Sequence, residues 1–267
     1  MKIQGKVFVV TGAGSGIGRS LTLAMLKGGA KVAAVDINEA NLKETASLAN
    51  AGTSLSTHVV DISNRQQIEA LRPAVVEAHG VVDGVVNNAG IIQPFIPLQD
   101  LDYGAIERVL NINLYGTIYM VKTFLPELLK RPEAHIVNVS SMGGFFPFPG
   151  QTLYGASKAA VKLLTEGLYA ELLDTQVNVS VVFPGAIATN ITKNSGVGNL
   201  GAEEAGDSKL PMTSPEVAAQ TIIGAIEKNK FQAYIGKDAA LMNILYKFNP
   251  RGATHFIQKQ MKGMLPK

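Results

Sequence analysis

The sequence predicts a doubly wound α/β fold in which helices cover both faces of a parallel sheet of about seven strands. Short β-branched runs alternate along the chain with longer segments of helical periodicity. The strand-like runs are nearly uniformly apolar, as parallel strands buried on both faces usually are. A glycine-rich turn, TGAGSGIG, joins the first run to the first helical segment. Strict alternation of this kind is typical of a doubly wound sheet.

The strand-like runs share short length and β-branched composition, and we expect strands at residues 6–10, 31–35, 55–60, 82–86, 135–139, 177–182 and 232–235. The segments between them have helical periodicity, and we expect helices near residues 17–28, 39–50, 64–79, 103–130, 153–174 and 215–229. Several begin with helix-start residues: Asn38, Ser63, and Ser214 followed by Pro215. The segment 192–214 is loop-like, and its length makes it a candidate lid.

Composition limits the class of protein. Of the 267 residues, 46% are hydrophobic and 17% are charged, which suffices for a large core and does not fit a disordered chain. The absence of cysteine excludes disulfides, thiolate metal sites and cysteine nucleophiles. The four histidines are scattered, so no metal site is expected. With no charged-then-apolar leader and no apolar run of membrane-spanning length, a cytoplasmic protein is expected.

The chain divides into a predicted single catalytic domain, residues 1–237, and a C-terminal helical extension, residues 238–267. From Lys237 onward there are six basic residues and one acidic residue, Asp238, while the rest of the chain holds 18 basic and 20 acidic residues. Apolar residues of the extension recur at helical spacing. We expect the extension to pack over the domain or on a partner subunit. Attachment to a membrane surface and docking of an acidic carrier are the alternatives.

The glycine-rich turn has the properties of a phosphate-binding loop. The pattern G-x-G-x-x-G is not matched in either register, but the physical requirements are met. Gly12 permits a tight turn, Gly16 lets the backbone approach a pyrophosphate, and Gly18 allows close helix packing. Ser15 and Ile17 lie between them, where backbone amides at a helix N-terminus face an anion. The turn therefore predicts a Rossmann-type dinucleotide site.

Asp36 ends the second predicted strand, 18 residues after Gly18. A carboxylate at this place accepts hydrogen bonds from both adenosine ribose hydroxyls and repels a 2′-phosphate. Positions 15 and 37, where a basic residue would attract that phosphate, are occupied by the uncharged residues Ser15 and Ile37. We therefore predict NAD rather than NADP as the cofactor. If Asp36 only caps a turn, the choice of cofactor stays open.

Tyr154 and Lys158 are four residues apart, so they lie on one face of the predicted helix. Free tyrosine has a pKa of about 10 and is a poor acid or base at neutral pH. A nearby ammonium favours the phenolate, and we expect it to lower the pKa of Tyr154. The pair is a candidate for general acid–base catalysis, although the same spacing also occurs by chance.

Six motifs occur in an order and spacing that resemble the short-chain dehydrogenase/reductase family in its compact form. They are TGAGSGIG, NNAG (87–90), NINLYG (111–116), VNVSS (137–141), YGASK (154–158) and PGAIAT (184–189), and the resemblance covers residues 4 to 237. It implies that Tyr154 is the catalytic acid and base. It also implies that Lys158 holds the nicotinamide ribose and lowers the tyrosine pKa.

The resemblance implies roles for further residues. Ser141 is implied to orient the substrate oxygen, with Ser140 as the competing choice. Asn113 is implied to hold a water in a proton relay to Lys158, with Asn111 as the alternative. The implied cofactor contacts are Asp61 and Ile62 at the adenine, Ile187 and Thr189 at the carboxamide, and Asn88, Ala89, Gly90, Pro184 and Gly185 along the cleft.

We therefore expect an oxidoreductase that transfers a hydride between NAD(H) and a secondary alcohol or ketone, and by resemblance a homo-oligomeric one, a dimer or tetramer. Segments around the expected site are poor in charge, and Phe145, Phe146 and Phe148 are candidates to line an apolar pocket. This favours a lipophilic substrate of steroid, terpenoid or acyl type. The alternative is a non-catalytic NAD-binding sensor. The domain lacks the motifs of α/β-hydrolases and P-loop NTPases and any basic stripe for nucleic acid.

Overall fold

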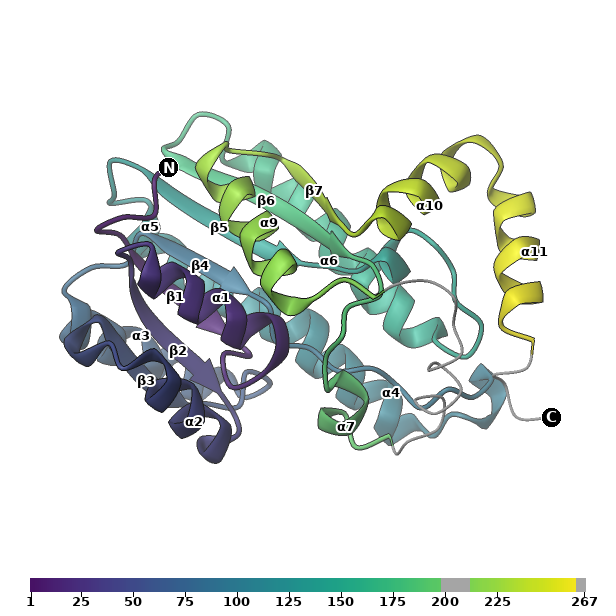
Figure 1. Ribbon diagram of the computed structural model, residues 1–267, viewed down its shortest axis with the longest axis horizontal. Coiled ribbons are helices and arrows are strands. Elements are labelled where there is room, and N and C mark those ends of the chain that lie inside the picture. Colours follow the sequence, from purple (N-terminus) through teal and green to yellow (C-terminus); the bar gives the residue numbers. More distant parts are fainter. Residues whose placement is uncertain (198–211, 263–267) are drawn as a thin grey trace.

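The computed structural model describes residues 1–197 and 212–262. At its centre is a seven-stranded sheet whose neighbouring strands are all parallel, in the order β3-β2-β1-β4-β5-β6-β7 (Figure 1). The predicted doubly wound fold is therefore confirmed. The strands are β1 (Val7–Thr11), β2 (Lys31–Asp36), β3 (Leu55–Val59), β4 (Gly84–Asn87), β5 (Ala134–Val139), β6 (Val177–Pro184) and β7 (Gln232–Ile235).

The strand order reverses at β1, which lies between β2 and β4. Val9 of β1 pairs with Ala33 on one side and with Val85 on the other. The strands β2 and β3 therefore lie on one side of β1, and β4 to β7 lie on the other. The loops after β1 and β4 separate at the carboxyl edge of the sheet. In open α/β sheets, ligands bind at such a switch point.

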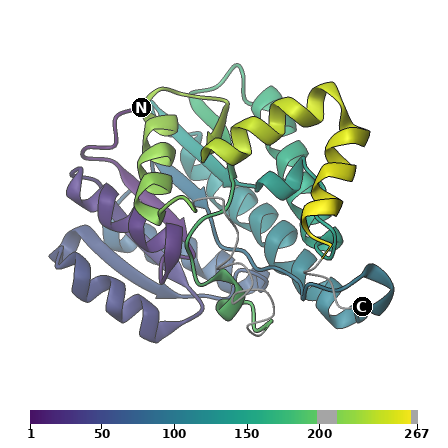
Figure 2. The same ribbon diagram turned by 45° about the vertical axis from the view of Figure 1, so that its right-hand side comes forward.

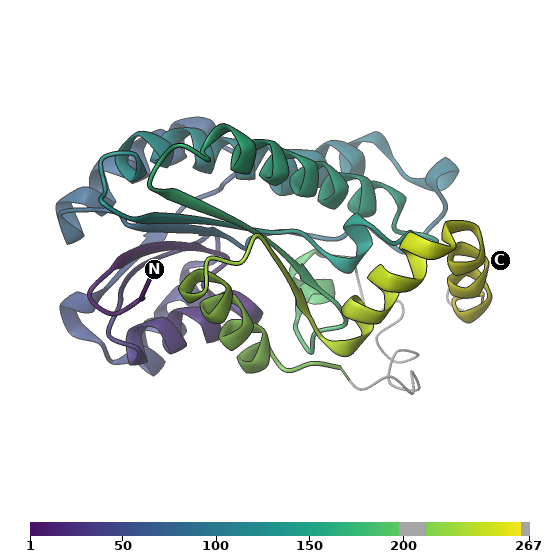
Figure 3. The same cartoon turned by 90° about the horizontal axis from the view of Figure 1, so that it is seen from above.

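Helices cover both faces of the sheet, and Figure 3 shows the two layers from above. One layer contains α1 (Gly16–Lys27), α2 (Glu39–Ala49) and α9 (Pro215–Glu227). The other contains α3 (Arg65–His79), α4 (Tyr103–Leu110), α5 (Gly116–Leu128) and α6 (Thr152–Glu171). An apolar core lies between the sheet and each helical layer, and these two cores fix the positions of the strands and of their carboxyl ends.

The two cores use alternate residues of the same strands. Val10 of β1 packs with Leu21 of α1 and Ile222 of α9, whereas Val9 packs with Ile68 of α3 and Phe124 of α5. All six side chains are buried. Because successive side chains of a strand point to opposite faces, uniformly apolar strands require a helical layer on each side.

The predicted helix over residues 103–130 is wrong in one respect, because it is not a single α-helix. A π-helical turn, η3 (Asn111–Tyr115), separates α4 from α5. A π turn contains an extra residue per turn and often occurs at a functional site. Here it carries Asn113, whose side chain is buried, while Asn111 is exposed.

Helix starts follow local sequence signals with one shift. Asn38, Asp102 and Ser214 accept a hydrogen bond from the backbone of the helix that each precedes. The start of α3 is capped by Asn64 rather than by Ser63, because the Asn64 side chain accepts the first-turn N–H groups. The hydroxyl of Ser63 instead donates to Asp61 at 2.7 Å.

The C-terminal extension forms two helices, α10 (Lys237–Phe248) and α11 (Pro250–Gln260), that project beyond β7 (Figures 1 and 2). Tyr246 of α10 packs edge-on against Phe146 at 5.8 Å between ring centroids. The extension is expected to pack over the domain or on a partner subunit; in the single chain its apolar residues Leu241, Ile244, Leu245 and Phe248 are all exposed, so packing on a partner stays a prediction.

Two sequence expectations concern residues outside the described part. The candidate lid at 192–214 includes residues 198–211, which lie outside the described part of the chain. The first residues of the candidate lid belong to the short helix α7 (Ile191–Asn194). The extension is described up to residue 262 only. Within residues 1–197 and 212–262, no helix is long and apolar enough to span a membrane.

Candidate active site

The phosphate loop between β1 and α1 is shaped by its glycines. Gly12 and Gly16 have φ of +69° and +51°, values that favour glycine. A Cβ on Gly12 would lie 2.8 Å from Asn88 Nδ2, and one on Gly18 would collide with the carbonyl of Gly12. Ser15 precedes the helix in extended conformation, and Ile17 packs against the core. The open amino end of α1 fits a dinucleotide pyrophosphate.

Asp36, the last residue of β2, lies beside this loop. Its Oδ2 accepts a hydrogen bond from Gly14 N at 2.9 Å, and its Oδ1 accepts one from Asn38 N at 2.9 Å. The side chain is partly exposed, so each oxygen retains acceptor capacity toward solvent. This arrangement fits the two hydroxyls of an adenosine ribose.

The loop after β3 contributes the residues expected at the adenine. Asp61 is partly exposed, and its Oδ1 accepts the backbone N–H of Ser63 at 2.8 Å. The Ile62 side chain is buried against Gly116, where an added Cβ would lie 2.9 Å from it. Ile62 therefore faces the core with its side chain, and only its backbone is left for a base.

The loop after β4 crosses the switch point and is fixed to β1. The Thr11 hydroxyl accepts the N–H groups of Asn88 and Ala89 at 3.0 and 3.1 Å. A Cβ on Gly90 would lie 3.1 Å from both Asn113 Oδ1 and Lys158 Nζ. Glycine at position 90 thus leaves room for the catalytic lysine implied by the sequence.

The loop after β6 approaches the phosphate loop from the other side. Ile187 forms a β-bridge with Thr213. Thr189 lies close to Gly16, since a Cβ added to Gly16 would be 3.1 Å from the methyl carbon of Thr189. At its end, Asn194 of α7 donates to Ser15 Oγ at 2.9 Å. The predicted contacts Pro184 and Gly185 begin this loop, and Gly185 N donates to Ile235 O at 2.9 Å.

Tyr154 and Ser141 are brought together by the first turn of α6 and the end of β5. Burial raises the pKa of Tyr154, and a hydrogen bond with Ser141 partly opposes that rise. Ser141 Oγ accepts the N–H of Gly143 at 3.0 Å, which leaves the hydroxyl proton free for the tyrosine or a substrate oxygen. Ser140, the competing choice, donates its hydroxyl to the carbonyl of Lys158 at 2.7 Å.

Lys158 is buried one helical turn after Tyr154. Burial lowers its pKa to about 8, and its Nζ donates to Val139 O at 3.0 Å. The sequence-based expectation that Lys158 lowers the tyrosine pKa differs from the structure, where desolvation has the larger effect and raises it. Two buried groups each disfavour their charged form, because the protein solvates charge less well than water.

Asn113 serves as a clamp in this structure. Its Oδ1 accepts Ile91 N at 2.9 Å, and its Nδ2 donates to Ile91 O at 2.9 Å and to Ser157 Oγ at 3.0 Å. The side chain is fully buried. The π turn thus ties the loop after β4 to α6.

The aromatic residues expected to wall the substrate pocket surround a hollow of about 270 Å³, lined by Phe145, Phe146, Phe148 and Tyr246 and by the small residues Gly155, Ala156 and Ala159 of α6. Ser141 and Tyr154 are not among the described residues that line it. The three phenylalanines therefore line a hollow as expected, but its role as a substrate pocket stays a prediction, because the predicted site residues Ser141 and Tyr154 do not line it.

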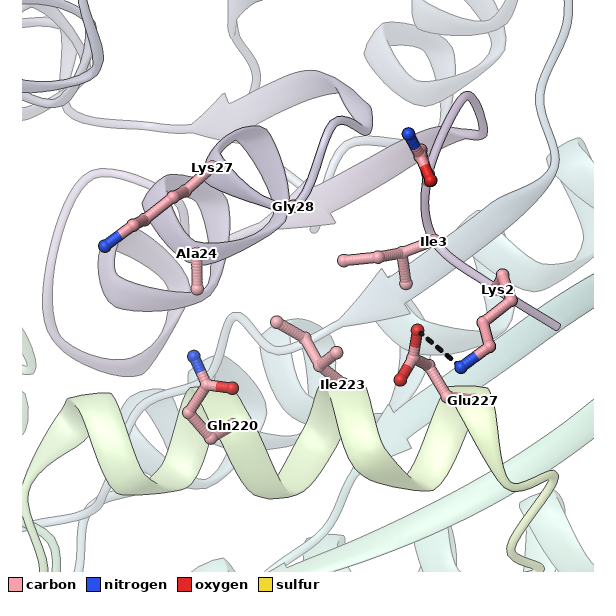
Figure 4. A pocket seen from close by; sticks show the side chains of 9 residues that line it. Lys2, Ile3, Ala24, Lys27, Gly28, Gln220, Ile223 and Glu227 are labelled. Carbon is pink, nitrogen blue, oxygen red and sulfur yellow. Dashed lines mark ion pairs between the residues drawn. The ribbon is translucent and has the colours of Figure 1, made fainter.

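A larger hollow of about 620 Å³ lies between the amino-terminal segment, α1 and α9 (Figure 4). Its lining includes Ile3, Ala24 and Gln220, and an ion pair joins Lys2 to Glu227 at 3.8 Å. None of the site residues predicted from the sequence is among its described lining residues. Within the described ranges, no group of three His, Cys, Asp or Glu residues could hold a metal ion.

Sequence reasoning missed Gln93 and Ser157. Gln93 stands in a charge-poor segment, IIQPFIP, where no motif singles it out. Ser157 lies inside the YGASK motif, but neither its burial nor its partner is visible in the pattern. Gln93 reaches the first turn of α6 from a loop distant in sequence, and Ser157 joins that turn to Asn113 of the distant π turn.

Comparison with known proteins identifies the family of this chain. The short chain dehydrogenase family model matches residues 6–199. A putative oxidoreductase of Mycobacterium tuberculosis, SadH, is 36% identical over 249 residues, covering 91% of this chain and 90% of the relative.

Two solved structures share the fold over nearly the whole chain. One is a short chain dehydrogenase/reductase from Burkholderia phymatum in complex with NAD, with a TM-score of 0.87 at 28% identity, covering 94% of this chain and 95% of that one. The other, from Burkholderia cenocepacia in complex with NADP, has a TM-score of 0.81 at 27% identity and covers 96% and 99%. The glycine-rich loop before α1, the strand order of the sheet and these matches lead to one conclusion: the chain belongs to the short-chain dehydrogenase/reductase family of oxidoreductases.

Proposed function

We propose that the protein transfers a hydride between NAD(H) and a secondary alcohol or ketone, with Tyr154 as general acid and base. The observation that carries the proposal is the meeting of three side chains: the ring of Tyr154 and Ser141 Oγ lie 3.4 and 3.5 Å from the Cβ position of Gly143, and Lys158 is buried one helical turn after the tyrosine. These groups lie at the carboxyl edge of the sheet, where the phosphate loop also opens. A proton donor and a nucleotide cradle at one edge are the two parts that such a reaction requires.

The chain's own residues supply the proton and the orientation. Nicotinamide, when bound, accepts or supplies the hydride. Tyr154, whose pKa is raised by burial, is a neutral phenol that donates its proton to the oxygen of a ketone. Ser141 donates a hydrogen bond to the same oxygen as negative charge develops on it. Lys158 and Asn113 lie behind the tyrosine, where we place the return path of the proton.

NAD is the cofactor that the chain's residues favour. Asp36 has acceptor capacity left at the place of the ribose hydroxyls, and a 2′-phosphate there would meet its negative charge. Arg19, the nearest basic residue of the loop, is already paired with Glu44 at 2.6 Å. The complexes of the two similar structures, one with NAD and one with NADP, are both compatible with the family.

For the substrate we propose a lipophilic alcohol or ketone of steroid, terpenoid or acyl type. Support comes from the apolar segment after β4, where Ile92 is buried and charged residues are missing between Gly90 and Leu98. The substrate would contact this segment and the face of Tyr154. A screen of NAD(H)-linked turnover over hydrophobic secondary alcohols and ketones tests this, and activity confined to small polyols would contradict it.

We also propose a homo-oligomer, in the cytoplasm, with the C-terminal extension at a subunit contact. The support is the exposed apolar face of α10, on which Phe248 is 87% exposed. A face of this kind on a small helix usually marks an interaction surface. Sedimentation velocity of the full chain decides this, since a monomer at working concentration contradicts the proposal.

Tyr154→Phe tests the proposed function against a non-catalytic NAD-binding sensor. The change removes only the phenolic oxygen, and general acid–base catalysis contributes about 10²–10⁴-fold in rate. We expect turnover to fall by about 10²-fold or more while the dissociation constant of NAD stays within about twofold, since the phenolic oxygen would act only in the proton transfer. A variant that keeps full turnover, or a wild-type protein that binds NAD but turns over no carbonyl or alcohol, would support the sensor.

A further inference from the structure

The amino end of α6, which carries Tyr154, is capped by a side chain from a distant segment of the chain. The helices α2, α3, α4 and α9 are each capped by the side chain of their own N-cap residue. Among the described residues, the N-cap of α6, Gln151, makes no such bond with its side chain. The first-turn N–H groups of α6 therefore need an acceptor from elsewhere.

Gln93 supplies that acceptor from the loop after β4. Its Oε1 accepts the backbone N–H of Leu153 at 2.7 Å and that of Tyr154 at 3.0 Å. Its own carbonyl accepts Nε2 of Gln151 at 2.8 Å. The Gln93 side chain is 1% exposed, so water does not replace it as a partner. Gln93 thus holds the start of α6 through three hydrogen bonds, two accepted by its side-chain oxygen and one accepted by its backbone carbonyl.

The other side of the Tyr154 peptide is held as well. Ser157 Oγ donates to the Tyr154 carbonyl at 2.7 Å and accepts Nδ2 of Asn113 at 3.0 Å. The N–H and the C=O of the tyrosine are therefore both bound to buried side chains. Gln93 and Ser157 thus fix the backbone of Tyr154, and the position of that backbone determines where the phenol points.

Gln93 itself is held through its neighbours. Asn113 binds both backbone groups of Ile91, and Ser195 Oγ, fully buried, accepts Ile92 N at 3.0 Å. Three successive residues of this loop are thus tied to three different elements: the π turn, the segment after α7, and α6. A side chain on so fixed a backbone can define the position of a helix end.

We propose that Gln93 is a positioning residue for Tyr154, holding the first turn of α6 so that the phenol meets the substrate oxygen. The proposal rests on the proposed role of Tyr154 as acid and base. Proton transfer depends steeply on distance and alignment. Loss of the acceptor would leave two first-turn N–H groups unpaired and free the helix start to shift.

The structure provides a matched pair of variants. Nε2 of Gln93 is buried and has no hydrogen-bond partner within the described residues. Gln93→Glu therefore keeps the acceptor and breaks no bond of the side chain. Gln93→Met has a similar length but no acceptor for the two N–H groups. The carboxylate of Gln93→Glu would also place negative charge next to Tyr154, which raises the pKa of the phenol.

Steady-state kinetics across pH, with thermal unfolding and NAD titration, test the proposal. For Gln93→Met we expect kcat to fall tenfold or more, with the dissociation constant of NAD within about twofold of wild type. For Gln93→Glu we expect most of kcat to return and the limb of the pH profile assigned to Tyr154 to move to higher pH. If Gln93 served only the stability of the fold, the pH limb would not move, and kcat would fall only in proportion to the loss of folded protein.

Wild-type kcat and pH profile in Gln93→Met would overturn the proposal, as would equal losses in both variants together with lost NAD binding. If Gln93→Met does not fold, the pH profile of Gln93→Glu decides, and an unchanged limb overturns it. Ring-labelled tyrosine NMR, with Tyr154→Phe to assign the signal, gives the phenol pKa without turnover. An altered phenol pKa in an inactive protein would uphold the role of Gln93 while the proposed function fails.

Discussion

The carboxylate of Asp238, in the first turn of α10, accepts a hydrogen bond from the backbone N–H of Ala186, with 2.7 Å between Oδ2 and N. The same carboxylate fills the space in which a Cβ of Gly185 or of Gly236 would lie. The C-terminal extension is therefore joined to the loop after β6, where we place the nicotinamide contacts.

Asp238→Ala should weaken cofactor binding. The change removes the partner of Ala186 N and leaves a gap beside Gly185, so the loop carrying Ile187 and Thr189 gains freedom. A hydrogen bond to a charged group contributes about 1.5–3 kcal/mol, so we expect the dissociation constant of NAD to rise about tenfold. Asp238→Asn, which keeps an oxygen acceptor, is the control and should lose less. Equal binding by all three proteins in fluorescence titration would contradict this coupling.

Asp36→Ala should reduce the preference for NAD over NADP. Removal of the carboxylate takes away acceptors for the ribose hydroxyls and the charge that repels a 2′-phosphate. We expect NAD to bind about tenfold more weakly and NADP to bind no worse. Asp36→Asn, which can still accept from Gly14 N, separates the effect of charge from that of loop structure. The ratio of the two dissociation constants is the measurement, and an unchanged ratio speaks against the assignment.

Lys158 should limit activity at alkaline pH. Burial lowers its pKa to about 8, so the ammonium is present below that pH and is lost above it. If the charged form is the one that serves the reaction, kcat/KM falls as pH rises through about 8. Lys158→Arg keeps its charge at all these values and should show lower activity without this limb. A wild-type profile that is flat from neutral pH to well above 8 would exclude this role.

His135 should make the fold sensitive to acid. The side chain is fully buried in β5, with Nε2 at 2.8 Å from Ser180 Oγ, and burial lowers its pKa to about 3 from an ordinary 6.5. Since the unfolded chain takes up the proton first, stability is complete above pH 6.5 and declines as pH falls toward 3. Each pH unit in this window costs about 1.4 kcal/mol.

Urea unfolding at pH 7 and pH 5 measures this decline. His135→Gln should be less stable than wild type at pH 7 because the buried site is repacked, but should lose less of its stability between the two pH values. The exposed His255 provides the control, and His255→Gln should follow wild type at both. A decline of equal size in His135→Gln would show that other groups cause the acid sensitivity.

Much of the fold could be predicted because its signals are local. Uniformly apolar strands, a glycine-rich turn after the first of them, and cap residues such as Asn38 and Ser214 act within a few residues of where they stand. The π turn at Asn111–Tyr115 could not be predicted. Asn113 makes its bonds to Ile91 and Ser157, and these partners are remote in sequence.

The candidate site divides in the same way. Tyr154 and Lys158 share a helix face by their spacing alone, and the sequence by itself determined that they are neighbours and that Gly12, Gly16 and Gly18 form a turn before a helix. The pKa values of Tyr154 and Lys158 were decided by the tertiary structure, because desolvation depends on what covers a group. Burial raises the pKa of Tyr154 against the expected direction.

The sequence alone also determined the order of the elements, and with it the sheet edge at which the site lies. Only the tertiary structure decided what holds Tyr154 and the first turn of α6 in place. Gln93 reaches its first-turn N–H groups from a loop 61 positions earlier, and the apolar face of α10 points away from the domain. Hydrogen bonds between distant segments follow from packing, and packing is a property of the whole chain rather than of any local pattern.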